Sequence, residues 1–372
     1  MRTIVIGAGP SGLAAAACLK RAGAQVEMFE RADSIGSAWR NHYDRLHLHT
    51  VKSRSGLPHR ALPGHVSRYP SRSEMIAYLE DYARAFALTP RLGCAVHTVQ
   101  PSENGWTVQH DGGESPADTV VCATGLNGQP NRPAWPGQDG FPGPVLHSSD
   151  YHSATPFTGQ RILVVGFGNS GGDIALDLAE AGAQVTLSVR GPVNILPKEL
   201  FGIPITSMGL LRKLMPYRLA DALTAPILRA KIGRPEDYGL QSAHKGPAAQ
   251  VIEDGRVPLI DIGALPAIKA SRIAVRPGIV GFDGATVAFA DATSVGFDAV
   301  ILATGYRADL RALLPDTGDV LDADGRPRVS GGPSGARGLY FCSYHASADG
   351  QLRQSGIEAR AIAAHAMSRA AA

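Results

Sequence analysis

Residues 3–30, TIVIGAGPSGLAAAACLKRAGAQVEMFE, place a glycine loop between a short apolar strand and an alanine-rich helix. Three glycines follow the spacing Gly7-x-Gly9-x-x-Gly12, and a second strand ends at Glu30. The first glycine permits a tight turn, the second lets the backbone approach a pyrophosphate, and the third lets helix and strand pack closely. The N-terminus of the helix attracts the phosphate charge. Strand, loop, helix and terminal acid together predict a dinucleotide-binding βαβ unit.

The acid at the end of the second strand narrows the choice of dinucleotide. Glu30 lies 23 residues after Gly7, where a carboxylate can accept hydrogen bonds from the two hydroxyls of a ribose. A ligand with a free 2′-hydroxyl, FAD or NAD, therefore fits this unit better than NADP does.

A second loop of the same kind occupies residues 161–190, RILVVGFGNSGGDIALDLAEAGAQVTLSVR. Gly166, Gly168 and Gly171 repeat the spacing, but the second strand ends at Arg190 in place of an acid. A guanidinium at this position suits the 2′-phosphate of NADPH. The alternative is a solvated surface arginine that contacts no cofactor.

The two loops belong to a longer duplication. Each is followed, more than a hundred residues later, by a strand ending in Ala-Thr-Gly, which is VVCATG at 120–125 and VILATG at 300–305. Alternating apolar stretches with glycine or aspartate turns precede both strands and indicate β-meanders. We therefore predict an α/β fold with two Rossmann-like dinucleotide-binding domains, the first for FAD and the second for NADPH.

The order of these segments predicts the domain boundaries. Residues 1–153 form the first segment of the FAD domain, and residues 154–306 form an inserted NADPH domain. Residues 307–372 repeat neither glycine loop, so we expect them to return and complete the FAD domain. A helix starting near residues 353–356 either faces the flavin pyrimidine oxygens with its N-terminus or only closes the domain.

Composition argues against several other classes. The chain has 372 residues, of which 44% are hydrophobic and 19% charged, and its net charge of +3 comes from scattered residues without a nucleic-acid footprint. The four cysteines form no C-x-x-C pair and no zinc-like spacing, so we expect no redox dithiol and no metal site. A strand begins at Thr3, and no run of about 18 apolar residues occurs. We expect a soluble, cytoplasmic protein.

A third stretch separates the flavoprotein classes. Reductases of disulfides, small electron-transfer reductases and oxygenases share these two domains, so the fold alone does not choose among them. Residues 141–151, FPGPVLHSSDY, place Phe141, Gly143, His147 and Tyr151 in the spacing F-x-G-x-x-x-H-x-x-x-Y, just before the second glycine loop. This pattern resembles the identifying motif of flavin-containing monooxygenases, and GFGNSGGDIA resembles the NADPH loop of that family.

The resemblance covers nearly the whole chain and extends to the YUCCA branch, the indole-3-pyruvate monooxygenases of plants. The stretches that look like that branch are YDRLHLHTVKSRSGLPH (43–59), ILPKELFG (195–202), VPLIDIGALPAIKASRI (257–273) and VILATGY (300–306). The resemblance implies that NADPH reduces FAD, that NADP⁺ stays bound, and that O₂ forms a C4a-(hydro)peroxyflavin that oxygenates a substrate. The protein then has to keep a dry, preorganised pocket, with no catalytic triad and no metal.

If the likeness extends to the substrate, the reaction is oxidative decarboxylation of an aryl 2-oxo acid such as indole-3-pyruvate. Arg40, Lys52 and Arg54 are candidate cations for its carboxylate. Two alternatives stay open: oxygenation of a soft amine or sulfide, and an NADPH-dependent flavin reductase, oxidase or redox-sensing flavoprotein. The expected partner is a small molecule, and the sequence leaves open whether the chain is a monomer or a homodimer.

The resemblance also implies roles for individual side chains. His49 stands three residues before Lys52, where many family members have an asparagine, so a ring nitrogen could stabilise the peroxyflavin. The alternative is a buried histidine bonded to the backbone. Trp39 either lies beside the flavin or packs in the core. His147 has no carboxylate or nucleophile in its own segment, so we interpret it as bracing the domain crossover rather than as a base.

The candidate cofactor contacts combine the two glycine loops with these positions. For FAD they are Gly7, Gly9, Pro10, Ser11, Gly12, Glu30, Arg31, Trp39, Arg40, His49, Thr50, Val96, Ala123, Thr124, Gly125 and Gln354. For NADPH they are Lys52, Gly166, Gly168, Asn169, Ser170, Gly171, Arg190, Ala303, Thr304 and Gly305.

Residues 196–255 have an apolar, helical pattern inside the NADPH domain. We expect Pro216 and Pro226 to break this segment into short helices. Three interpretations remain: packing on the NADPH domain, a substrate lid or dimer contact, and peripheral membrane binding.

Overall fold

The computed structural model describes residues 1–207 and 215–371, and the chain divides into two compact units. Unit 1 contains Met1–Arg40, Thr50–Gln129 and Tyr306–Ala372, and unit 2 contains Asn41–His49 and Pro130–Gly305. The chain leaves unit 1 at β7 (Gln129–Pro130), earlier than the expected boundary after residue 153, because β8 pairs with β19 inside unit 2. It returns at β20 (Tyr306–Arg307).

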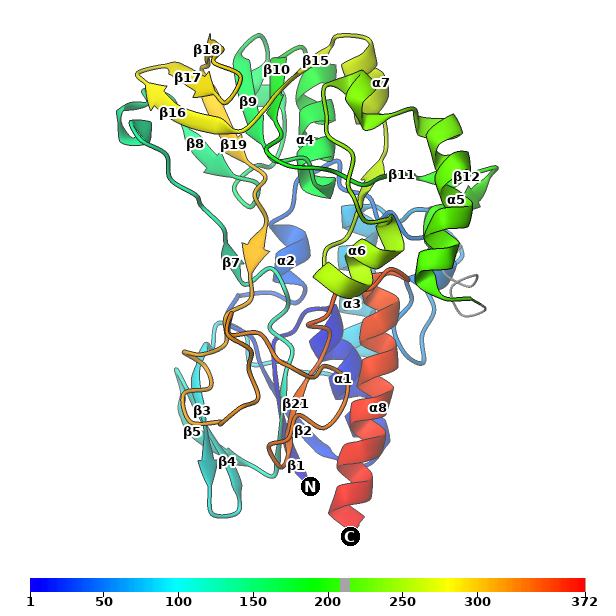
Figure 1. The fold of residues 1–372 in the computed structure, drawn as a ribbon. Helices are drawn as coiled ribbons and strands as arrows, with labels where there is room; N and C mark the ends of the chain where they lie inside the picture. The colour runs from blue at the N-terminus through cyan, green and yellow to red at the C-terminus, as the bar shows by residue number, and fades with distance from the viewer. Residues whose placement is uncertain (208–214, 372) are drawn as a thin grey trace. The chain divides into compact units, whose positions relative to one another are not determined.

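Unit 1 is built on a parallel sheet in the strand order β2-β1-β6-β21. Helices α1 and α8 lie side by side next to this sheet (Figure 1). Ala14–Ala17 of α1 are fully buried, and their small side chains let the neighbouring backbone approach closely. The bounds are β1 (Arg2–Ile6), α1 (Pro10–Arg21), β2 (Gln25–Phe29), β6 (Thr119–Cys122), β21 (Leu339–Phe341) and α8 (Gln351–Ala371).

The remaining elements of unit 1 are an antiparallel meander and three further helices. In the meander, β4 alternates half-buried and buried residues, the period-2 pattern of a strand with one face on the core. Helix α3 begins with a capping box, in which Glu74 N donates to Ser71 Oγ and Ser71 N donates to Glu74 Oε2. The bounds are α2 (Ser37–Arg40), η1 (Lys52–Arg54), α3 (Arg72–Ala85), β3 (Val96–Ser102), β4 (Gly105–His110) and β5 (Gly113–Ala117).

Unit 2 repeats this plan around a parallel sheet in the order β15-β10-β9-β19-β8. A second meander, β16 to β18, precedes β19 as β3 to β5 precede β6. The α/β fold with two Rossmann-like domains is therefore confirmed. The bounds are β8 (Val145–His147), β9 (Arg161–Val165), α4 (Asn169–Glu180), β10 (Gln184–Ser188), α7 (Ala264–Lys269), β15 (Ile273–Arg276), β16 (Ile279–Asp283), β17 (Thr286–Phe289), β18 (Ser294–Gly296) and β19 (Ala299–Leu302).

The insertion in unit 2 differs from its prediction. It contains short strands as well as helices, and α5 begins after Pro216 but continues through Pro226, so the expected break at Pro226 was wrong. The strong helix formers around Pro226 outweigh its missing hydrogen bond. Residues 208–214 of this segment lie outside the described part. The bounds are β11 (Ile195–Pro197), β12 (Glu199–Leu200), β13 (Ile203–Pro204), α5 (Tyr217–Ile232), η5 (Pro235–Tyr238), α6 (Pro247–Asp254) and β14 (Leu259–Asp261).

Small 3-10 turns complete the described elements, at η2 (Gln138–Gly140) and η3 (Thr155–Phe157). Among residues 1–207 and 215–371, no helix is long and apolar enough to cross a membrane, and no group of His, Cys, Asp or Glu side chains could hold a metal ion. The four cysteines are all unpaired and buried.

Candidate functional site

The first glycine loop has the shape of a phosphate cradle. A Cβ on Gly7, whose φ is +106°, would lie 2.6 Å from the carbonyl oxygen of Ala123. A Cβ on Gly12 would lie 1.9 Å from the carbonyl oxygen of Gly7, so both positions exclude a side chain. No atom lies within 4 Å of the position that a Cβ on Gly9 would occupy. Helix α1 starts at the next residue, Pro10. Open space at a helix N-terminus fits a pyrophosphate.

Glu30 is fixed at the edge of this cradle. It is buried, and its Oε2 accepts a hydrogen bond of 2.7 Å from the amide of Ala8 while its Oε1 accepts one of 3.0 Å from the amide of Ala32. Each carboxylate oxygen has a second lone pair, which can accept a ribose hydroxyl. The carboxylate is thus preorganised in its orientation.

The second glycine loop repeats the geometry in unit 2. A Cβ on Gly166 would lie 2.6 Å from the carbonyl oxygen of Ala303, and a Cβ on Gly171 would lie 2.1 Å from the carbonyl oxygen of Gly166. A Cβ on Gly168 would meet no atom within 4 Å. Arg190 is exposed just after β10, and in the described part of the chain it forms no ion pair. A solvent-facing guanidinium is available to a phosphate.

Three of the other candidate side chains are held by the protein itself. Asn169 Oδ1 accepts a hydrogen bond of 2.8 Å from the amide of Ile260, which ties α4 to β14. Lys52, which we expected to contact NADPH, lies in unit 1. Its Nζ donates hydrogen bonds of 2.7 Å to the carbonyl oxygens of Gly64 and Val66. Gln354 donates from Nε2 to Glu358 at 2.9 Å.

The remaining candidates of unit 1 are spread over several elements. Trp39 is half-buried, Arg31 is exposed, and Arg40 forms an ion pair with Glu80. Thr124 lies after β6, where its amide donates to the Tyr344 hydroxyl at 3.1 Å. Six other candidates are half-buried, namely Ser11, Thr50, Val96 and Gly125 in unit 1 and Ser170 and Thr304 in unit 2, whereas Gly305 of unit 2 is exposed. Three of them have hydrogen-bond partners: Ser11 bonds Ser355, Thr50 bonds Ser55, and Thr304 bonds Asn131.

The motif of residues 141–151 is held by contacts within unit 2. Phe141 packs on Phe282 with ring centroids 5.7 Å apart, and a Cβ on Gly143 would lie 2.1 Å from the carbonyl oxygen of Asp298. Tyr151 is buried and donates a hydrogen bond of 2.5 Å to Asp177. These contacts join the segment to the sheet, the meander and α4.

His147 is fully buried, and both ring nitrogens have partners. Nδ1 accepts a hydrogen bond of 3.1 Å from the amide of Ser149, so Nε2 carries the proton and donates to the carbonyl oxygen of Gly305 at 3.0 Å. Burial lowers the pKa of His147 below its ordinary value. The ring is therefore a neutral brace between β8 and the end of β19.

A buried polar cluster surrounds Asp173 on α4. Tyr43 donates a hydrogen bond of 2.8 Å to Asp173 Oδ2, and His49 Nε2 lies 3.8 Å from the same oxygen. Among the described residues His49 Nε2 is buried without a hydrogen-bond partner. Burial and the Asp173 carboxylate raise the pKa of Tyr43 far above its ordinary value. Sequence reasoning missed Tyr43 and Asp173, although an acid in the apolar pattern of α4 was a visible signal.

Two glycine loops of the same geometry, one in each unit, are typical of a flavoprotein of the two-dinucleotide-binding class. Residues 4–198 match the family profile described as pyridine nucleotide-disulphide oxidoreductase. Indole-3-pyruvate monooxygenase YUCCA1 of Oryza sativa subsp. japonica is 39% identical over 349 residues, covering 92% of this chain and 86% of the rice protein. Probable indole-3-pyruvate monooxygenase YUCCA3 of Arabidopsis thaliana is 38% identical over 356 residues, covering 92% and 81%.

Solved structures show the same fold. A flavin-containing monooxygenase from Stenotrophomonas maltophilia superposes with a TM-score of 0.74 at 24% identity, covering 98% of both chains. Cyclohexanone monooxygenase in an open form gives 0.78 at 20% identity, covering 100% of this chain and 88% of its own. The chain belongs to the YUCCA family of flavin-containing monooxygenases, and it is an FAD- and NADPH-dependent monooxygenase.

Proposed function

We propose that the reaction is oxidative decarboxylation of an aryl 2-oxo acid, represented by indole-3-pyruvate. The observation that carries this proposal is 37–39% identity over 92% of the chain to relatives named indole-3-pyruvate monooxygenases. One 2-oxo acid, O₂, NADPH and H⁺ give the carboxylic acid shortened by one carbon, CO₂, H₂O and NADP⁺. One oxygen atom of O₂ enters the new carboxyl group and the other leaves as water.

The cradle geometry supports FAD in unit 1. Gly9 leaves its backbone open, and α1 presents free amides, so these groups bind the pyrophosphate while Glu30 accepts hydrogen bonds from the ribose. Bound FAD, once reduced, supplies the electrons that activate O₂. The contribution of this chain is then to orient the cofactor and to exclude water from its pocket.

The corresponding groups of unit 2 support NADPH there. Gly168 and the N-terminus of α4 bind the pyrophosphate, and Arg190 holds the 2′-phosphate. Arg190 is the residue that separates NADPH from NADH, because NADH has a hydroxyl where NADPH has this phosphate.

His49 is our candidate for proton handling. A buried nitrogen without a partner is unusual in a folded protein and often marks a functional position. We assign to Nε2 of His49 the task of holding or passing a proton during oxygenation, with Asp173 and Tyr43 fixing the surroundings of the ring.

The test is product formation per NADPH consumed, using the FAD-loaded enzyme with indole-3-pyruvate, phenylpyruvate, trimethylamine and a thioether. Release of CO₂ and of the arylacetic acid, near one per NADPH with the two 2-oxo acids only, supports the proposal. Oxygenation of the amine or thioether instead overturns the decarboxylation. Formation of H₂O₂ alone with every compound overturns the oxygenation of these substrates.

We also infer a cytoplasmic location, supported by four cysteines that are all unpaired and buried, as is usual in a reducing compartment. Fractionation of cells that produce the chain with a C-terminal epitope tests this inference. Recovery of the chain in a secreted or membrane fraction contradicts it.

A further inference from the structure

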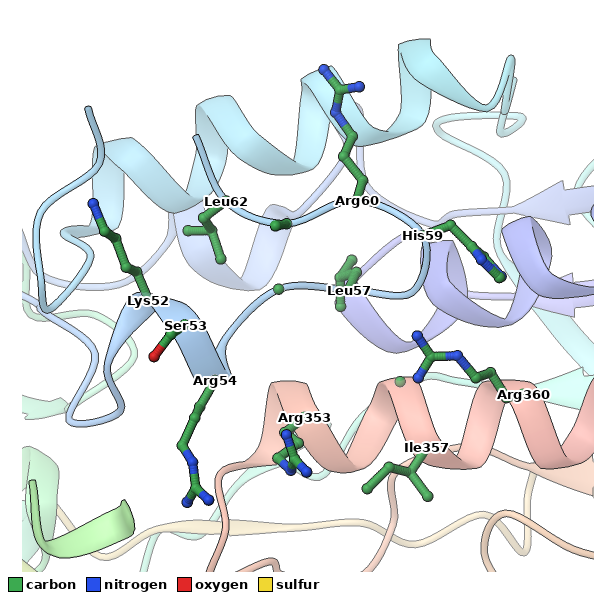
Figure 2. A pocket seen from close by; sticks show the side chains of 13 residues that line it. Lys52, Ser53, Arg54, Leu57, His59, Arg60, Leu62, Arg353, Ile357 and Arg360 are labelled. Carbon is green, nitrogen blue, oxygen red and sulfur yellow. The ribbon is translucent and has the colours of Figure 1, made fainter. Parts of the chain in front are cut away.

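A pocket of about 560 Å³ lies in unit 1, between residues 52–62 and one side of α8. Its described lining contains no residue of either glycine loop. Figure 2 shows Arg353, Ile357 and Arg360 along α8, with the guanidinium of Arg360 extending toward this segment. The volume falls within the range of small-molecule sites. The lining consists of Lys52, Ser53, Arg54, Gly56, Leu57, His59, Arg60, Ala61, Leu62, Arg353, Gly356, Ile357 and Arg360.

The charge of this pocket is one-sided. Five of its described lining residues are lysine or arginine, and none is aspartate or glutamate. Lys52 is held by two carbonyl oxygens, and Arg60 forms an ion pair with Asp81 at 2.6 Å. Arg353 and Arg360 form no hydrogen bond or ion pair with any residue that the structure describes. Two guanidinium groups therefore face the pocket with their donors available to a ligand.

The positive field also acts on a neighbouring side chain. Burial and then the charges of Arg21 and Arg360 lower the pKa of His59 below its ordinary value. This lowered pKa shows that the positive charge of Arg360 reaches residues 52–62. The positive charge available to an anion in the pocket is that of Arg353 and Arg360.

The wall opposite α8 is preorganised. Tyr78 of α3 accepts a hydrogen bond of 2.7 Å from the amide of Leu57 and donates one of 2.6 Å to the carbonyl oxygen of Arg60. Tyr82, also on α3, donates to the carbonyl oxygen of Pro58 at 2.8 Å. These bonds hold the backbone of His59 at a φ of +66°, a conformation that residues other than glycine rarely adopt. Strained positions held in this way are frequent at ligand sites.

The lining is apolar as well as cationic. Leu57, Ala61 and Leu62 line one wall, and Ile357 lies between Arg353 and Arg360 on the other, with 47% of its surface exposed. Residues 353 and 360 are two helical turns apart, about 10 Å. A small inorganic anion would use only the charge, whereas an organic anion would also bury its apolar part.

We propose that this pocket binds a monocarboxylate with an apolar body. Arg353 holds the carboxylate in a bidentate pair, because it is half-buried while Arg360 is exposed, and desolvation strengthens the pair. The apolar body lies against Ile357 and Leu57. The identification of this ligand as the aryl 2-oxo acid or the arylacetic acid of the enzyme rests on the proposed function. The existence of a monocarboxylate site does not depend on it.

Binding is measured by calorimetry on the full, FAD-loaded chain without NADPH, so that no turnover occurs. The probes are phenylpyruvate, phenylacetate, uncharged 2-phenylethanol and inorganic phosphate. We expect both carboxylates to bind at least about tenfold more tightly than the alcohol, a difference typical of one charge-assisted hydrogen bond. Tighter binding of phenylpyruvate assigns the site to substrate, and tighter binding of phenylacetate assigns it to product. Phosphate that competes as well as either carboxylate overturns the organic ligand.

Variants locate the site. Arg353→Gln should weaken carboxylate binding about tenfold or more, Arg353→Lys should weaken it less, and Arg360→Gln should have a smaller effect than Arg353→Gln. Arg326→Gln, which removes an exposed arginine of the same unit outside the pocket, is the matched control and should change nothing. The FAD content of each variant verifies folding. Carboxylate affinity unchanged in Arg353→Gln overturns the proposal.

Photo-crosslinking separates this proposal from the proposed function. An aryl-azide carboxylate should label peptides containing residues 52–62 or 353–360, and excess phenylacetate should prevent the labelling. Labelling without any decarboxylation product keeps the pocket and removes the proposed reaction. Decarboxylation without labelling of these peptides removes the pocket and keeps the reaction.

Discussion

Tyr43 donates a hydrogen bond of 2.8 Å to Asp173, although the two residues are 130 positions apart in the sequence. Both side chains are buried, so the tyrosine hydroxyl supplies a bond that water cannot replace. This pair anchors residues 41–49 to α4 and thereby positions His49 within unit 2.

Removal of this hydroxyl should destabilise the protein. Tyr43→Phe leaves the Asp173 carboxylate without its donor and should lower the free energy of unfolding by about 1–3 kcal/mol, measured by urea denaturation. Tyr217→Phe removes a similar bond, to Glu253, at an exposed site and should change stability by less than about 0.5 kcal/mol. Equal losses in the two variants would contradict a special role for the buried pair.

Alanine substitutions at two glycines of the first loop should affect different properties, FAD affinity at Gly9 and folding at Gly12. Gly9→Ala adds a Cβ with nothing within 4 Å, so the apoprotein should keep its stability but lose FAD affinity by about tenfold or more. Gly12→Ala adds a Cβ at 1.9 Å from a carbonyl oxygen and should disturb folding. The measurements are thermal unfolding of the apoprotein and FAD titration. Normal FAD affinity in Gly9→Ala would argue against the assigned cradle.

Arg190 should determine the preference for NADPH. Arg190→Gln removes the charge facing the 2′-phosphate and should lower kcat/KM for NADPH by about 10- to 100-fold, leaving that for NADH nearly unchanged. Anaerobic flavin reduction by each nucleotide gives the two values. Arg272→Gln, at another exposed arginine of unit 2, is the control. A parallel fall for both nucleotides would show that Arg190 acts elsewhere.

His147 should make stability depend on pH. Its folded-state pKa is depressed below the ordinary value of 6.5, so the unfolded chain takes up a proton first as the pH falls. The contribution of His147 is thus fully present above about pH 6.5 and is lost as the pH falls toward its lower folded pKa. His147→Gln should be less stable at pH 8 by about 1–3 kcal/mol, and its deficit should shrink below pH 6.5.

The readout is the difference between the two proteins, because other histidines titrate in both. A deficit that grows as the pH falls would contradict a neutral, buried His147. A stable, FAD-loaded His147→Gln variant without oxygenation would show that the ring takes part in the reaction.

Local spacing explains why much of the fold could be predicted. The glycine spacing predicts the geometry of the loop, because Gly7 and Gly12 pack closely together and Gly7 also lies against Ala123, the residue after β6. Gly166, Gly171 and Ala303 repeat these contacts in unit 2. The parallel sheets and the meanders follow from these units and from the alternating apolar residues around them.

Tertiary contacts explain what could not be predicted. Nothing in residues 41–49 signals that they belong to unit 2, because their partners on α4 follow about 130 residues later. The amide of Asn169 appears in the glycine loop as a ligand group, yet it bonds Ile260, 91 positions away. The pocket on α8 likewise depends on Arg353 and Arg360 meeting residues 52–62, which no motif records.

Oxygenation with ¹⁸O₂ tests the central claim most directly. The FAD-loaded enzyme is given NADPH, phenylpyruvate and ¹⁸O₂, and the phenylacetic acid formed is analysed by mass spectrometry. Decarboxylation by this monooxygenase predicts one ¹⁸O atom in the new carboxyl group and one molecule of CO₂ per phenylacetic acid. Phenylacetic acid without ¹⁸O, or H₂O₂ with no phenylacetic acid, would contradict the account.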